Sequence, residues 1–194
     1  MNKALAAGLI VLLVAGTVMA AGLPKVVVKT EFGDITVEID TAKAPATSAN
    51  FLRYVDAGLY DGTVFHRTVT LSSPRNKPIV IEVIQGGEMP DGVKGFDPIA
   101  LERTSVTGLG HLDGTISMAR SGPDSATSSF FFCVGPQPEL DFGGKRNKDG
   151  QGFAAFGRIV AGMEVVRRIH RSPVNDQEQL TPPVKILSVR RVGE

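Results

Sequence analysis

Apolar and polar residues alternate along several short stretches of the chain, which is the pattern of β-strands with one buried face. Within residues 25–40 (KVVVKTEFGDITVEID), Ile35, Val37 and Ile39 alternate with polar neighbours, and Gly33 is suited to the turn of a hairpin. Further short strands, bounded by Gly and Pro, are predicted around residues 62–69, 79–85, 114–119, 129–135 and 183–192.

Two segments have helical spacing instead. Residues 44–60 carry Pro45 in the first turn and place Phe51, Tyr54 and Val55 on one face. The second predicted helix, residues 161–171, has apolar residues on one side at Met163, Val166 and Ile169. Many short strands with only two brief helices favour an all-β barrel or sandwich.

The first 20 residues have the three parts of a secretory signal peptide, with Lys3 at the start, an apolar run from 4 to 18, and small residues around Ala20. Cleavage after Ala20 would leave residues 21–194 as one domain, secreted and expected in a periplasm. A retained membrane anchor is the alternative, because the run is only slightly short of a spanning helix. After cleavage no stable membrane insertion is expected, since no other stretch is apolar enough to cross a bilayer.

Composition excludes several function classes. The chain has 21 Lys and Arg against 20 Asp and Glu, with no basic stripe, so nucleic-acid binding lacks its electrostatic basis. Cys133 is the only cysteine, lies in the apolar run SFFFCVG, and is expected to be a buried small hydrophobe.

The usual catalytic patterns are missing from the sequence. The three histidines are scattered and Cys133 has no partner cysteine, so no metal site is predicted. No phosphate-binding glycine motif and no G-x-S-x-G nucleophile motif occurs. The sequence therefore offers no bond-breaking machinery, and a hydrolase has no motif behind it.

Three segments in order explain this absence: FHR (65–67), QGG (85–87) and SMARSGPDSATSSFFF (117–132). With APATSANF (44–51) before them and AAFGRIVAGMEVV (154–166) after them, they resemble the cyclophilin family of peptidyl-prolyl cis-trans isomerases. The resemblance implies a closed eight-stranded antiparallel β-barrel capped by two short α-helices. It also implies rotation of the bond preceding proline in proline-containing polypeptides, by a monomer that needs neither cofactor nor metal, and assistance in the folding of exported proteins.

The resemblance also assigns roles to nine residues. Arg67 would be the catalytic residue and donate a hydrogen bond to the prolyl nitrogen, and Phe131 would form the floor of the proline pocket. The other expected substrate-binding residues are His66, which borders the site, Val83 and Leu140 (walls), Gln85 (substrate backbone), Ala119 and Arg120 (the strip along which the peptide lies) and Phe153 (pocket lining). Taken singly, Phe131 also fits a core position, Gln85 a turn and Arg67 a solvated strand end.

Several positions depart from the family pattern, among them Phe153, which stands where the family has a histidine. Glu82 and Glu139 stand where the family usually has aromatic residues, and acidic side chains there are expected to wet the pocket. An alternative function is therefore a cyclophilin-like module that binds proline peptides, or acts as a chaperone, with weak or no isomerase activity. The resemblance also predicts weak binding of the inhibitor cyclosporin, which in the family depends on the aromatic replaced by Glu139.

The stretch between Arg67 and Gln85 contains a polar segment, residues 70–78 (TLSSPRNKP). Its ends are anchored next to expected site residues. It is predicted either to be a passive surface loop or to form a rim whose Arg75 and Lys77 favour acidic residues next to proline.

Overall fold

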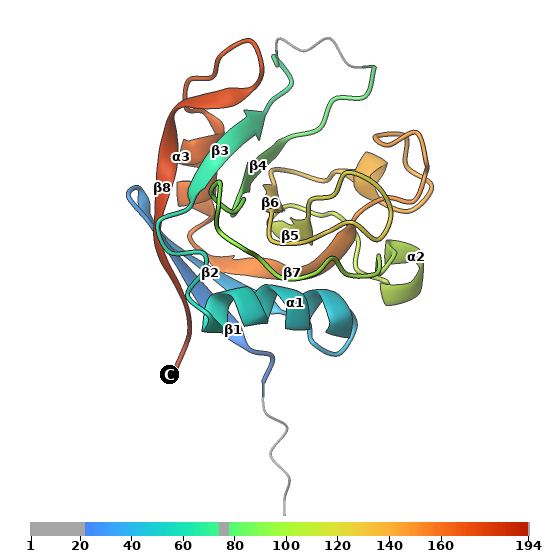
Figure 1. Ribbon diagram of the computed structural model, residues 1–194. Helices are drawn as coiled ribbons and strands as arrows, with labels where there is room; N and C mark the ends of the chain where they lie inside the picture. Colours follow the sequence, from blue (N-terminus) through green and yellow to red (C-terminus); the bar gives the residue numbers. More distant parts are fainter. Residues whose placement is uncertain (1–21, 74–77, 194) are drawn as a thin grey trace, which may run out of the picture.

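The computed structural model describes residues 22–73 and 78–193, and these form a closed β-barrel (Figure 1). Around the barrel the strands run in the order β1-β2-β7-β5-β6-β4-β3-β8, and every neighbouring pair is antiparallel. The bounds of the strands are β1 Lys25–Thr30, β2 Gly33–Ile39, β3 Val64–Val69, β4 Val83–Gly86, β5 Thr115–Met118, β6 Phe130–Cys133, β7 Ala154–Ala161 and β8 Gln179–Arg191. The predicted eight-stranded antiparallel barrel is confirmed.

Both predicted helices are present. Helix α1 (Pro45–Asp56) packs against β7 and β8, and α3 (Met163–His170) packs against β2, β3 and β4, so the two cover different parts of the barrel. A single helical turn, α2 (Thr104–Thr107), and a 3-10 turn, Pro138–Leu140, were not predicted. Neither has the length that gives a readable helical period.

Strand β7 was also missing from the strands that alternation predicts. Its first half is buried on both faces and its second half is largely exposed, so its apolar and polar residues do not alternate. Strand β8 begins at Gln179 instead of residue 183, and β4 is shorter than the predicted 79–85. Apart from β7, the hydropathy pattern therefore located each strand correctly, but it did not give the residues at which the strands begin and end.

The interior of the barrel is filled by one face of each strand together with the apolar face of α1. Phe51 of α1 packs edge-on against Phe130 of β6, with 5.5 Å between the ring centroids, and both rings are fully buried. Phe65, Phe132 and Phe156 join this cluster. Burial of such large apolar surfaces is the main source of stability for a chain without disulfides.

A second, smaller apolar cluster lies on the outer face of the barrel. It contains Val69, Ile81, Val83, Phe131, Cys133 and Leu140, with Ala119 and Phe153 packed against it. Successive side chains of a strand point to opposite faces, so Phe130 and Phe132 enter the barrel while Phe131 and Cys133 lie outside it. Cys133 is buried as expected, and burial raises the pKa of its thiol above the ordinary value.

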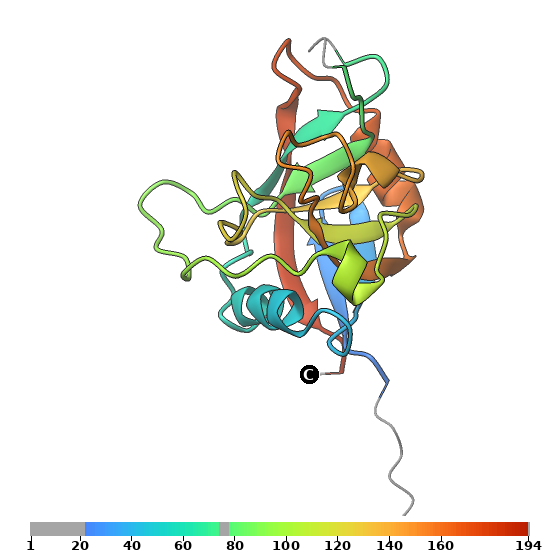
Figure 2. The ribbon, with the colours of Figure 1, turned by 90° about the vertical axis from the view of Figure 1, so that its right-hand side faces the viewer.

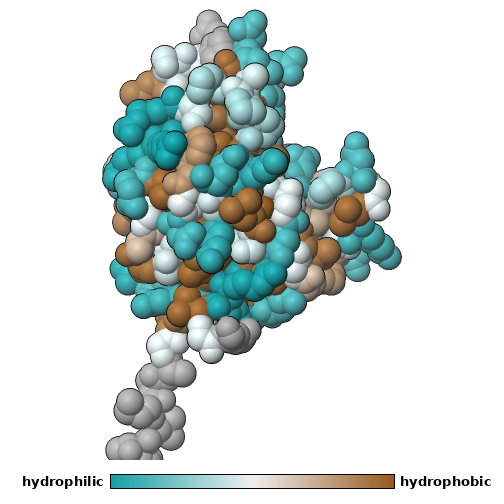
Figure 3. Space-filling view, turned by 90° about the vertical axis from the view of Figure 1, so that its left-hand side faces the viewer, coloured by the Kyte–Doolittle hydropathy of each residue, from teal (hydrophilic) through white to brown (hydrophobic). Residues whose placement is uncertain are grey.

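Long connections complete the molecule. The segment between β4 and α2 projects away from the barrel (Figure 2) and is anchored by Phe96, whose ring lies 4.8 Å from that of Tyr54. On the face drawn in Figure 3, hydrophobic residues are dispersed among hydrophilic ones. No helix within the described ranges has both the length and the hydropathy needed to cross a membrane. The expected signal peptide, residues 1–20, lies outside the described residues.

Candidate functional site

A bulge in β3 directs Arg67 to the outer face of the barrel. The register of β3 shifts between Phe65 and Arg67 against both of its neighbours, β4 and β8. In a regular strand these two residues would share a face, whereas here Phe65 is fully buried in the barrel and Arg67 lines a cavity outside it. The extra residue at His66 is therefore what places a cation beside the outer apolar cluster.

The key side chains form a row across adjacent strands. Arg67 of β3 pairs with Gln85 of β4, which pairs with Phe131 of β6, which pairs with Ser117 of β5. Residues paired in this way have neighbouring side chains on one face of the sheet. Segments that lie far apart in sequence thus meet within one row.

Two glycines allow β4 to pass close to the core aromatics next to this row. A Cβ added at Gly86 would lie 2.7 Å from the ring of Phe65, and one added at Gly87 would lie 2.5 Å from the ring of Phe130. Gly87 also has a φ of +72°, which disfavours other residues. The QGG segment therefore holds Gln85 in place through the close approach of its two glycines to the core.

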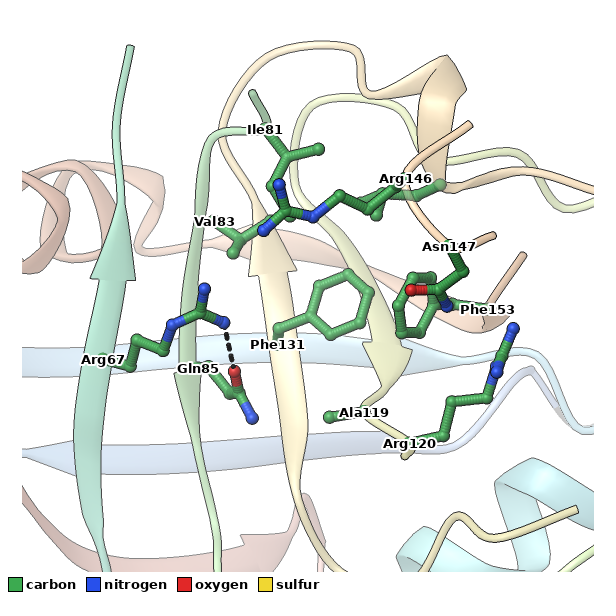
Figure 4. Close-up of a pocket in the computed structure, with 11 residues that line it drawn as sticks. Arg67, Ile81, Val83, Gln85, Ala119, Arg120, Phe131, Arg146, Asn147 and Phe153 are labelled. Atoms are coloured by element: carbon green, nitrogen blue, oxygen red, sulfur yellow. Dashed lines mark hydrogen bonds between the residues drawn. The ribbon is translucent and has the colours of Figure 1, made fainter. Parts of the chain in front are cut away.

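The guanidinium of Arg67 is held on two sides (Figure 4). Its Nη1 donates to Gln85 Oε1 at 3.0 Å, and its Nε donates to Glu178 Oε2 at 3.1 Å. Arg67 Nη2 also donates to Glu178 Oε2. Gln85 is oriented in turn, because its Nε2 donates to Ser129 Oγ at 3.2 Å. Gln85 and Glu178, from separate parts of the chain, thus fix one planar cation, and Ser129 fixes Gln85.

Beside this cation lies a cavity of about 330 Å³, lined by apolar side chains and by polar and charged ones. Phe131 forms its floor and is only 4% exposed. The ring of Phe153 meets it perpendicularly at 5.4 Å between centroids, and the ring of His111 stacks on it at 5.9 Å. Packing from two sides leaves the Phe131 ring little freedom, so the cavity has a preformed apolar floor with a hydrogen-bond donor at its edge.

The wall of the cavity opposite Arg67 is built by the loop that precedes β7. Arg120 donates to both carboxylate oxygens of Asp149, at 2.8 and 3.0 Å, and to the carbonyl oxygen of Gly152 at 2.8 Å. The Arg120 guanidinium also lies 5.1 Å from the ring centroid of Phe153. Its hydrogen bond lowers the pKa of Asp149 below the ordinary value. Arg120 therefore holds the loop before β7 in place beside the cavity.

The structure brings eight of the nine expected site residues together around this one cavity. They are Arg67, Val83, Gln85, Ala119, Arg120, Phe131, Leu140 and Phe153. His66 is beside the cavity without lining it: its Nε2 lies 3.6 Å from Glu88 Oε2, and its buried Nδ1 has no hydrogen-bond partner among the described residues. Burial lowers the pKa of His66 and Arg67 adds to this effect, while Glu88 opposes it.

Five residues of the site were not predicted from the sequence. Ile81, Arg146 and Asn147 line the cavity, Glu178 holds Arg67, and His111 supports Phe131. Ile81 lies two positions before Val83, so strand alternation could have indicated it. No local pattern could have found Glu178, which is 111 positions from Arg67.

The expectation that Glu82 and Glu139 wet the pocket is wrong, since neither lines the cavity. Glu82 alternates with Ile81 and Val83 and points to the opposite side, where its carboxylate lies 4.0 Å from His170 Nε2. The Glu139 carboxylate accepts a hydrogen bond from the backbone N–H of Lys145 at 2.8 Å. Glu139 thus stabilises the loop before β7.

One set of contacts in the site has the order of a serine-hydrolase triad. His111 Nδ1 lies 2.7 Å from Asp141 Oδ1, and His111 Nε2 lies 2.9 Å from Ser117 Oγ. Ser117 pairs with Phe131 on the neighbouring strand and is fully buried, so no substrate carbonyl can reach its hydroxyl. These bonds fix the His111 ring and provide no accessible nucleophile. In the part of the chain that the structure covers, no three His, Cys, Asp or Glu residues gather to hold a metal ion.

Comparisons with known proteins find relatives that match most of the chain. Residues 25–191 match the family described as "Cyclophilin type peptidyl-prolyl cis-trans isomerase/CLD". A peptidyl-prolyl cis-trans isomerase of Acinetobacter baylyi is 36% identical over 168 residues, covering 84% of this chain and 82% of the relative. Peptidyl-prolyl cis-trans isomerase B of Escherichia coli is 37% identical over 144 residues, covering 72% and 80%.

Solved structures show the same fold. The crystal structure of a Cryptosporidium parvum cyclophilin type peptidyl-prolyl cis-trans isomerase superposes with a TM-score of 0.71 at 22% identity. It covers 88% of this chain and 98% of its own. A second structure of that protein, determined in the presence of the dipeptide Ala-Pro, has the same TM-score.

Proposed function

We propose, from the premise that this chain belongs to the cyclophilin-type peptidyl-prolyl cis-trans isomerases, that Arg67 and the Phe131 cavity carry out the isomerisation. The chain is a peptidyl-prolyl cis-trans isomerase by its family and by relatives that are about 36% identical. The observation that carries the proposal is a guanidinium fixed on two sides at the edge of a cavity with an aromatic floor.

The reaction needs no nucleophile, because no covalent bond is broken. Amide resonance opposes rotation of the bond before proline with a barrier of about 18–20 kcal/mol. Uncatalysed isomerisation takes roughly 10–100 s. To bring this time below a millisecond, an enzyme must remove roughly 7 kcal/mol from the barrier.

Arg67 supplies a stabilisation that is specific to the twisted state. When the bond twists, resonance is lost and the prolyl nitrogen becomes a hydrogen-bond acceptor. A guanidinium that is always charged and already oriented donates to this nitrogen at little cost in reorganisation. The planar ground state has no such acceptor, so the interaction lowers the barrier without merely tightening binding.

The cavity supplies the binding. The proline ring packs on Phe131, between Val83 on one side and Leu140 and Phe153 on the other. Gln85 holds the peptide backbone beside Arg67, and the peptide extends along Ala119 and the main chain of Arg120. This fixes the proline while the residue before it turns. His66 is not needed as an acid or a base, since the reaction transfers no proton.

The substrates that this site fits are proline-containing polypeptides, and we extend the proposal to unfolded exported proteins. The support is the pattern of residues 1–20, with Lys3, the apolar run and the small residues around Ala20. Mass spectrometry of the protein purified from the extracytoplasmic fraction should show a chain that begins at Ala21. If the protein is recovered only in the cytosol or the membrane, as a chain that begins at Met1, the proposal that it acts on exported proteins would be overturned.

A module that binds proline peptides without turning them over was the alternative. This alternative rested on the expectation that Glu82 and Glu139 wet the pocket, but neither residue lines the cavity. A protease-coupled assay on a proline peptide tests the proposed roles. Arg67→Ala should lower the catalysed rate by at least about tenfold, equal to about 1.4 kcal/mol of barrier. An unaltered rate would reject the role of Arg67.

A further inference from the structure

The carboxylate that holds Arg67 comes from an unusual backbone position. Glu178 lies in the turn before β8 and its side chain is 1% exposed. Its φ is +66°, in the left-handed region that residues other than glycine rarely adopt. A buried carboxylate on an unfavourable backbone conformation requires compensation from the surrounding contacts.

The turn around Glu178 imposes this conformation. The Glu178 N–H donates to the Asn175 carbonyl oxygen at 3.0 Å, and the Asn175 N–H donates to the carbonyl oxygen of Gln179 at 3.0 Å. Asn175 Oδ1 accepts hydrogen bonds from the N–H groups of Gln177 and Gln179, at 2.9 and 3.0 Å. The turn is therefore closed on itself, and Glu178 has no freedom to relax its backbone.

The turn is also fastened to the strand that carries Arg67. The N–H of Thr68 donates to the Glu178 carbonyl oxygen at 3.1 Å. Main chain and side chain of Glu178 thus contact consecutive residues of β3, just after the bulge at His66. This double attachment places the carboxylate against the side of the Arg67 guanidinium that bears Nε and Nη2.

The hydrogen bonds of Arg67 define which of its edges faces the cavity. A guanidinium has five N–H groups in a plane. Two donate to Glu178 and one donates to Gln85, so these partners occupy two of its edges. The remaining N–H of Nη1 and that of Nη2 are left for a substrate, since Arg67 lines the cavity beside Gln85 and Phe131 (Figure 4).

We propose that Glu178 is a positioning residue for the isomerisation, fixing the guanidinium of Arg67 so that its third edge points at the twisted prolyl bond. This inference rests on the proposed role of Arg67. Without the carboxylate, Arg67 would keep its charge and its contact with Gln85 but could rotate about its side-chain bonds. Misplacement of a catalytic group by about 1 Å costs on the order of a hundredfold in rate, so a partial loss of order has a measurable effect.

The test compares variants of the intact protein in a peptide isomerisation assay. Glu178→Gln retains the length of the side chain and removes its charge, and it should lower kcat about tenfold with KM changed less than about twofold. Glu178→Gly removes the carboxylate and also relieves the backbone at positive φ, so it supplies a folded second variant if the glutamine disrupts the turn. It should lower kcat at least as much as Glu178→Gln.

A matched control is Glu102→Gln. The Glu102 carboxylate also accepts several hydrogen bonds, from the N–H groups of Ala46 and Thr47 and from the Thr47 hydroxyl, but it lies outside the cavity. This variant should leave kcat unchanged even if it lowers the melting temperature. A general structural effect of losing a carboxylate would instead change kcat in both variants.

Two further measurements separate the possible failures. In the Arg67→Ala background, Glu178→Gln should cause no additional loss of kcat. The Arg67 Nε–H proton should exchange with water more slowly in the wild type than in Glu178→Gln. If Arg67→Ala itself retains full activity, the proposed role of Arg67 fails. If Arg67→Ala is impaired but Glu178→Gln keeps its kcat, or if the two losses add, the positioning role of Glu178 is overturned.

Discussion

Adjacent phenylalanines of β6 should have separable effects on stability and activity. Phe131 and Phe132 are neighbours in sequence, but Phe132 fills the barrel and Phe131 forms the floor of the outer cavity. Replacing each by alanine removes the same atoms from opposite faces of one strand. We therefore expect Phe132→Ala to act mainly on folding and Phe131→Ala to act on both folding and catalysis.

The structure sets the expected magnitudes. Phe132 is fully buried, with ring centroids 5.6 Å from Phe130 and 6.1 Å from Phe65, so its truncation should cost about 3–5 kcal/mol of unfolding free energy. At about 2–4 °C per kcal/mol, the melting temperature should fall by roughly 6–20 °C. Phe131 already borders an open cavity on one face, so its truncation should cost about 3 kcal/mol, at the lower end of that range.

The assay combines urea unfolding with peptide isomerisation below the melting temperature of each variant. Phe132→Ala should retain kcat/KM within about threefold, while Phe131→Ala should lose at least about tenfold because the proline ring loses its floor. Phe→Leu at both positions is the milder pair if an alanine variant does not fold. Equal losses of kcat/KM at the two positions would refute the assignment of opposite faces to opposite roles.

Three further predictions concern the surroundings of the site and the stability of the fold. Arg146 lines the cavity, with its Nη1 donating to the Ile79 carbonyl oxygen, and its charge should favour peptides with acidic residues beside proline. Arg146→Ala should reduce the differences in kcat/KM among peptides that differ only in flanking charge, and an unchanged ranking of these peptides would contradict this. Cyclosporin should bind weakly because Glu139 replaces the family's aromatic, and a calorimetric titration that gives nanomolar affinity would show otherwise. The hydrogen bond from Arg190 lowers the pKa of Asp61 in the folded protein. The pair therefore stabilises the fold fully at pH values above the pKa of Asp in the unfolded chain. This stabilisation is lost as the pH falls through the lower pKa of the folded state. Asp61→Asn should remove that part of the acid dependence of urea unfolding, and an identical pH profile would contradict it.

The apolar patterns alone left a barrel and a sandwich open, and the resemblance to the cyclophilins implied the closed eight-stranded barrel and the candidate site residues. Alternation identified the hairpin of β1 and β2, and the ordered motifs that carry the resemblance selected Arg67, Gln85 and Phe131 as candidates. Whether Phe131 was core or pocket could not be decided from three consecutive phenylalanines, since a strand buried on both faces has no alternation to read. The structure decides it through the pairing of β6 with β4 and β5.

The residues that sequence reasoning missed are placed by long-range contacts. Glu178 reaches Arg67 through the pairing of β3 with β8, and the bulge at His66 determines which face Arg67 occupies. The same limit explains the error at Glu82, whose orientation follows from its neighbours Ile81 and Val83 once β4 is placed. The hypothesis that residues 70–78 form a charged rim stays a prediction, because Arg75 and Lys77 lie outside the described residues.

The central claim is that Arg67 stabilises the twisted bond and not the bound peptide. The most direct test measures, by NMR exchange at saturating protein, the cis-trans interconversion rate of a bound proline peptide, together with its Kd. The account predicts that Arg67→Ala lowers the on-enzyme rate by at least about tenfold while Kd changes by less than about threefold. An unchanged on-enzyme rate, with the whole loss of activity explained by a weaker Kd, would contradict it.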